Sequence, residues 1–81
     1  MVEEGDDYYH VRFSDPDEFE EIRTPDWAND PAGSVVSGSE VRMGRDDDDW
    51  LVQSVLIPLD SVEDSDDASR RALEIASKIA D

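Results

Sequence analysis

The apolar positions of the chain fall into separate short runs, and each run has its own period. Residues 8–13 alternate as a half-buried strand does. One side of this strand would carry Tyr9, Val11 and Phe13, and the other Tyr8, His10 and Arg12. Residues 40–44 and 50–59 are two further apolar runs joined by the polar connection 45–49. Together they predict an antiparallel hairpin.

The last apolar run has a helical period. Its stripe at i, i+3, i+4 and i+7 consists of Ala72, Ile75, Ala76 and Ile79. Asp64 or Ser65 would cap this helix, and Lys78 lies near its end, where a positive charge suits the helix dipole. The pattern predicts a C-terminal amphipathic helix.

A shorter helix is predicted just after the first strand. Asp15 would cap it, Pro16 would take its first position, and Pro25 would end it. Phe19 and Ile22 are three residues apart and would share one face.

Residues 24–40 show no consistent period, and we read them as a loop with one helical turn. Two alternatives stay open here. One is a short helix opening at Asp30-Pro31 and ending at Gly38, and the other is a strand over residues 34–37.

These elements predict an α+β fold in the order β-α-β-β-α. It would have a three-stranded, mainly antiparallel sheet, with residues 34–37 as the alternative fourth strand, and the C-terminal helix packed on one face. Residues 1–7 would be a frayed acidic N-terminus, and residues 8–81 one small domain.

The composition is strongly acidic. Twenty-three Asp and Glu oppose 7 Lys and Arg, which gives a net charge of −16. High charge with few apolar residues is typical of disorder, but a disordered tail would not segregate its apolar residues into periodic runs. We therefore expect an ordered domain.

The kind of charge indicates a habitat rather than an activity. Asp outnumbers Glu 15 to 8, and the basic residues are six Arg and one Lys. This composition resembles that of small acidic proteins of halophilic archaea. The resemblance implies that the acids keep the protein hydrated in molar salt and hold monovalent cations without specificity.

Other classes of protein are disfavoured. The chain has no cysteine, so it has no disulfide and no thiolate chemistry. No apolar run approaches the roughly 18 residues of a membrane span, and the acidic N-terminus is unlike a leader, so we expect a cytoplasmic protein.

No catalytic, cofactor or metal motif is visible. The run Asp46–Asp49 lacks the glycine and the terminal glutamate of a calcium loop, and His10 is the single histidine. No serine has a nucleophile elbow around it, and the Gly33–Gly38 segment lacks the lysine of a phosphate loop. We expect no catalytic residue, no metal and no cofactor, and a protein that is not an enzyme.

The third strand is the most informative segment, because it is apolar at both odd and even positions. Such a strand should be covered on both faces, yet the chain offers one long helix. If that helix covers the odd positions, a candidate interaction face is left, made of Tyr8, His10, Arg12, Arg42, Trp50, Val52 and Leu56. Aromatic residues and arginine are typical of interface cores.

The sequence thus favours a small non-catalytic interaction module that forms a homodimer or binds another protein. A monomer would result if the predicted short helix and the Trp27 loop folded over this face. Single-stranded nucleic acid, for which the acidic charge is unfavourable, is an alternative ligand of a regulatory accessory protein. A small enzyme that uses His10 is the remaining alternative.

Overall fold

The computed structural model describes residues 2–80 and contains one five-stranded antiparallel sheet. The strands lie in the order β1-β2-β5-β4-β3. Their bounds are β1 Val2–Glu4, β2 Tyr8–Arg12, β3 Glu21–Arg23, β4 Glu40–Asp46 and β5 Asp49–Pro58. The helices are α1 Asp26–Val35 and α2 Ser65–Ala80, with short 3-10 turns η1 Pro16–Glu18 and η2 Leu59–Ser61.

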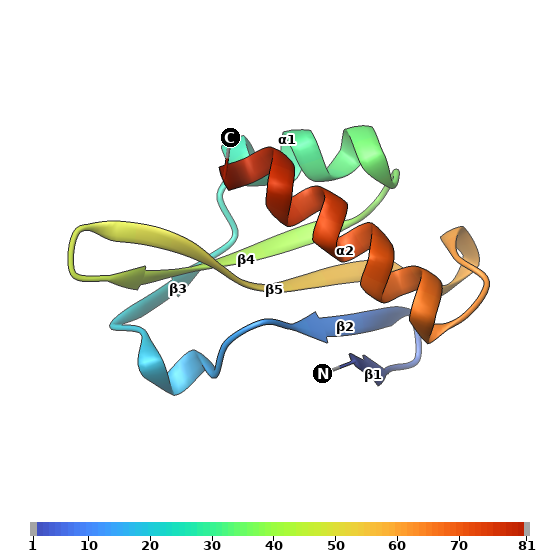
Figure 1. Ribbon diagram of the computed structural model, residues 1–81, viewed down its shortest axis with the longest axis horizontal. Coiled ribbons are helices and arrows are strands. Elements are labelled where there is room, and N and C mark those ends of the chain that lie inside the picture. The colour runs from blue at the N-terminus through green and yellow to red at the C-terminus, as the bar shows by residue number, and fades with distance from the viewer. Residues whose placement is uncertain (1, 81) are drawn as a thin grey trace.

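Both helices lie on the same side of the sheet, and the β4–β5 hairpin extends beyond them (Figure 1). Helix α2 packs on β5, β2 and β1, while α1 packs on β4 and on α2. The buried core lies between the two layers. It consists of Val11, Val41, Met43, Val55 and Ile57 from the sheet, Ala28, Ala32, Ala68, Ala72 and Ile75 from the helices, and Val36.

The strongest sequence patterns are confirmed. The α+β class, the antiparallel sheet, the hairpin and the C-terminal helix on one face are all present. The Asp64 side chain caps α2, where its Oδ1 accepts a hydrogen bond of 2.9 Å from the Asp67 amide. The hairpin turns through Asp47, whose φ of 56° lies in the left-handed region that aspartate tolerates better than most residues.

The helix predicted after Asp15 is wrong. Asp15 does cap a turn, since its Oδ1 accepts from the Asp17 amide, but the turn is the three-residue η1. The chain then enters β3, which pairs with β4 at the far edge of the sheet. A capping pattern indicates where a turn begins but not how long the helix after it will be. Here the chain leaves the turn after three residues, because Glu21–Arg23 can pair with the free edge of β4.

Residues 24–40 were also misread. A ten-residue helix, α1, occupies Asp26–Val35, so it begins before Asp30, ends before Gly38 and replaces the predicted strand over 34–37. Ala28 and Ala32 are fully buried one turn apart and hold it to the core. Its Asn29 side chain accepts a 2.9 Å hydrogen bond from the Val41 amide, on the part of β4 that β3 does not reach.

The N-terminal segment that was expected to fray contributes a strand. Residues Val2–Glu4 form β1 and pair with β2, so the sheet has five strands instead of three or four. Val2 packs against the core, which explains why so short a strand is kept.

Candidate functional site

The side of the sheet that faces away from the helices, called the open face below, carries two rows of paired residues. Val11, Val55 and Val41 pair across β2, β5 and β4 and are buried under the helices, so their neighbours along each strand point to the open face. The first row is Arg12, Ser54 and Arg42. The second row is Glu3, His10, Leu56 and Glu40.

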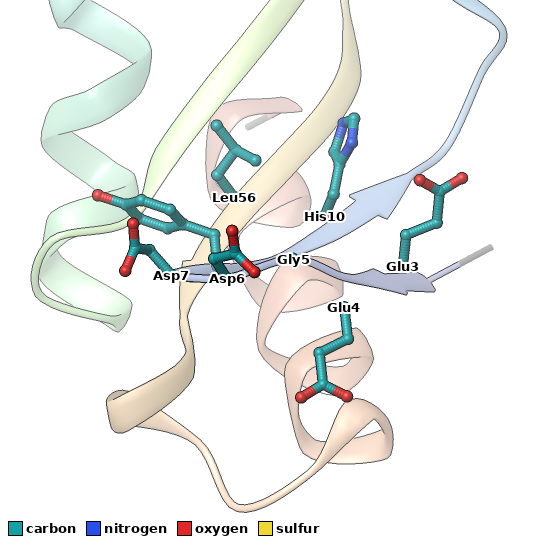
Figure 2. A pocket seen from close by; sticks show the side chains of 8 residues that line it. Glu3, Glu4, Gly5, Asp6, Asp7, His10 and Leu56 are labelled. Carbon is teal, nitrogen blue, oxygen red and sulfur yellow. The ribbon is translucent and has the colours of Figure 1, made fainter.

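Most of the predicted interaction face is therefore brought together. Tyr8, His10, Arg12, Arg42 and Leu56 all lie on the open face. Tyr8 pairs with Pro58, one step beyond the second row. Figure 2 shows Glu3, His10 and Leu56 on one side of the sheet and Glu4 on the other.

Trp50 and Val52 do not belong to this face, and the reason is a β-bulge. The register between β4 and β5 shifts at Gln53, so that Arg42 pairs with Ser54 but Met43 pairs with Val52. One extra residue reverses the alternation, and Trp50 and Val52 join the helix-covered side, where they pack against the core. Before Gln53 the even-numbered residues of β5 face the helices, and after it the odd-numbered residues do. This change is why β5 has apolar residues at both odd and even positions.

Other residues change sides for the same reason or lie outside the strands. Leu51, assigned to the helix side from its odd number, pairs with Gly44 on the open face. Phe13 follows the end of β2 and is partly exposed, and Leu59 begins the η2 turn. Most apolar residues of β5 therefore face the helices, and the open face of this strand carries fewer of them than the sequence predicted.

Residues 13–20, called the crossover segment, cover part of the open face near the hairpin. Phe19 lies against Gly44, whose missing Cβ would point to this side. The Gln53 amide donates a 2.8 Å hydrogen bond to the Ser14 carbonyl, and the Ser54 hydroxyl donates to the Gln53 side-chain oxygen. Both polar side chains are buried and satisfied in this way. The expected intramolecular cover is present on this half of the face, without a helix and without Trp27.

The uncovered half brings two of the six arginines beside His10 and the acids Glu3 and Glu40. Burial, and next the guanidinium groups of Arg42 and Arg12, lower the pKa of His10 below its ordinary value, while Glu3 acts in the opposite direction. His10 is therefore neutral at pH 7. Its Nε2 is buried and has no hydrogen-bond partner within residues 2–80, so no acid or nucleophile is aligned with it there.

Beyond the second row lies an open hollow of about 310 Å³ at the β1–β2 turn (Figure 2). It is lined by Tyr8, His10 and Leu56 and by the acidic residues Glu3, Glu4, Asp6 and Asp7. Within residues 2–80, no group of three His, Asp or Glu side chains could hold a metal ion.

A second apolar surface, on the helix side, was missed from the sequence. Trp50 and Trp27 line a pocket of about 190 Å³ together with Arg23 and Pro25, and the Arg23 guanidinium lies 5.9 Å from the centre of the Trp50 ring. Trp27 is 55% exposed. The two tryptophans could have indicated this surface. Because residues 24–40 were interpreted as a loop, the sequence did not show that Trp27 lies close to Trp50.

In the part of the chain that the structure describes, neither helix is long and apolar enough to cross a membrane. Comparison of the chain with protein-family models, with curated proteins and with solved structures found no match.

Proposed function

We propose that this protein is a small, non-catalytic interaction module that associates with a second copy of itself through the uncovered half of the open face. The single observation that carries the proposal is the composition of that half. Arg12, Arg42 and His10 stand beside the half-buried Tyr8 and Leu56, in a chain whose net charge is −16.

The composition is that of an interface more than of an acidic surface. A solvated face of this protein would be expected to carry mainly Asp and Glu, as most of the chain does. Arginine and aromatic residues are enriched where proteins associate. In the two rows of this half they stand beside only two acids, Glu3 and Glu40. Both helices pack on the other side of the sheet, so among residues 2–80 no helix lies over this half.

The proposal includes the environment. The acid-rich, lysine-poor composition fits a salt-rich cytoplasm, where screening reduces the repulsion between two copies of the same acidic chain. The surface carboxylates would then bind monovalent cations weakly and without specificity.

The experiment is sedimentation velocity in about 1 M KCl over a wide range of protein concentration. The wild-type protein should shift from monomer to dimer as its concentration rises. Leu56→Asp should remain monomeric, because it places a charge at the centre of the face. Leu73→Asp is the matched control, since Leu73 is 56% exposed on α2, and this variant should dimerise normally.

A wild-type protein that stays monomeric at every concentration would refute the proposal. Retention of a single-stranded oligonucleotide in the same salt, lost on changing Arg12 or Arg42, would replace it with nucleic-acid binding. Trp50, which the sequence placed on the interaction face, lies on the helix side of the sheet instead. Trp50→Ala is now expected to act on stability, because Trp50 packs against the core.

A further inference from the structure

Glu40 and Arg42 are opposite charges on the same strand and the same face, and neither has an ion-pair partner within residues 2–80. The other arginines are each held by a carboxylate: Arg12 by Glu3, Arg23 by Glu21, Arg45 by Glu20 and Glu21, and Arg70 and Arg71 by Asp67, with Glu74 also close to Arg71. In a chain with 23 acidic residues, an exposed arginine without such a partner is unusual.

The register places these two charges symmetrically about one line. Glu40 pairs with Leu56 and Arg42 with Ser54, so a line across the strands between the two rows passes midway between the charges. A two-fold axis along this line, with two open faces in contact, sets Glu40 of one copy opposite Arg42 of the other. The same operation forms the second, identical pair.

We infer that the protein forms an isologous, face-to-face dimer in which Glu40 and Arg42 of one copy pair with Arg42 and Glu40 of the other. This inference rests on the proposed self-association and specifies its geometry. The strands of the two copies run antiparallel across the interface and are aligned to within about 30°, as in other face-to-face sheet packings.

The shape of the open face is compatible with the same two-fold axis. The crossover segment stands above the sheet on the Ser54 side of the axis, where Phe19 covers Gly44, and the hollow lies on the Leu56 side. The two-fold operation exchanges these sides. Because the operation keeps each position across the strands, the start of the crossover segment, which leaves β2 after Arg12, faces the hollow of the other copy at the β1–β2 turn.

This fit brings acids together and makes the dimer depend on salt. The crossover segment contains Asp15, Asp17 and Glu18, and the hollow is lined by Glu3, Glu4, Asp6 and Asp7. At about 0.1 M salt the repulsion between them extends roughly 10 Å, and at about 1 M it falls to roughly 3 Å. The Glu40–Arg42 pairs, at direct contact and shielded from water, lose much less to screening.

Charge exchange tests the pairing directly. Glu40→Arg alone sets arginine opposite arginine twice, and Arg42→Glu alone sets glutamate opposite glutamate twice. Each single variant should dimerise at least about tenfold more weakly than wild type in about 1 M KCl. The double variant Glu40→Arg/Arg42→Glu should regain the wild-type dissociation constant, because the pairs are restored with exchanged signs.

The most discriminating sample is a mixture of the two single variants, one of them carrying a fluorescent label. Every facing pair in the mixed dimer joins an arginine to a glutamate, so the labelled variant should sediment as a dimer only when the other is added. This readout requires both variants to be folded, which far-UV circular dichroism verifies. Arg70→Glu, on α2, changes the net charge as Arg42→Glu does and should leave the dimer intact.

The outcomes separate the two proposals. If the wild-type chain never dimerises, the proposed function itself fails. If it dimerises but the single variants match wild type, or the mixture stays monomeric, only the face-to-face geometry fails. If Trp27→Ser abolishes the dimer and the charge variants do not, the interface lies at the pocket between Trp27 and Trp50, and the face-to-face geometry is wrong.

Discussion

The ring of Phe19 occupies the space that a Cβ at Gly44 would fill. A Cβ built at Gly44 falls well inside contact distance of three atoms of this ring. Gly44 also pairs with Ile22 of β3, at the edge of the sheet. The absence of a side chain at one position of β4 therefore fixes how the crossover segment lies on the open face.

Gly44→Ala should lower the free energy of unfolding by about 1–3 kcal/mol, because the added methyl group pushes on a packed ring. Urea unfolding in molar KCl measures the loss. Gly33→Ala is the control, since a Cβ there meets no atom within 4 Å and lies in α1, so it should be neutral or stabilising by about 0.5–1 kcal/mol. In a Phe19→Ala background the effect of Gly44→Ala should largely vanish, and an unchanged effect would contradict this contact.

Gln53→Ala should be costly although the residue lies in a bulge. It removes the donor to the half-buried Ser14 carbonyl and the acceptor of the Ser54 hydroxyl, and it leaves that hydroxyl fully buried without this partner. The expected loss is about 1–3 kcal/mol in the same urea experiment. Ser34→Ala, which removes an exposed hydrogen bond to the Pro31 carbonyl, should change stability by less than about 0.5 kcal/mol. Equal effects of the two substitutions would show that the buried network contributes little.

Mild acid should destabilise the fold through His10. The pKa of His10 is lowered in the folded protein by burial and by the nearby Arg42 and Arg12, so the unfolded chain takes up this proton first as the pH falls. Well above pH 6.5, the ordinary pKa of histidine, His10 is neutral in both states and contributes no slope. The free energy of unfolding should begin to fall as the pH approaches that value and continue to fall until the folded-state pKa is passed.

Melting temperatures of wild type and His10→Gln between about pH 7 and pH 5 isolate this contribution, because the two proteins share every other titratable group. The variant should lack the decrease in this window. If both proteins show the same slope, His10 is not the group responsible.

Salt should raise the melting temperature. Most of the charge is of one sign, and screening shortens the range of the repulsion between about 0.1 M and about 1 M KCl. We expect the melting temperature of wild type to rise steadily over this range, measured at a concentration where the protein is monomeric. A flat curve would contradict the adaptation to salt that the composition indicates.

The elements that could be predicted from the sequence are those with a long, regular period. Helix α2 repeats its apolar stripe over about three turns, and β4 and β5 are joined by a turn, so local pattern and final structure agree. Strand β3 has only three residues, and its strand geometry comes from its pairing with β4. No local signal of that length distinguishes a strand from the end of a helix.

The candidate face was predicted in part for a related reason. Tyr8, His10 and Arg12 alternate along an unbroken strand, and their side of the sheet follows directly from the sequence. The register shift at Gln53 could not be foreseen, because a bulge is set by the pairing of two strands rather than by the strand that contains it. Every assignment before Gln53 in β5 was therefore reversed, while Leu56 after it was correct.

The hydrogen bond from the Val41 amide to Asn29 has a consequence for how the molecule can assemble. It occupies a main-chain donor on the part of β4 that β3 leaves uncovered, and the two border strands, β1 and β3, are three residues long. Little main chain is left along which another molecule could extend the sheet sideways. Growth into fibrils, which proceeds by adding strands to the edge of a sheet, is therefore disfavoured.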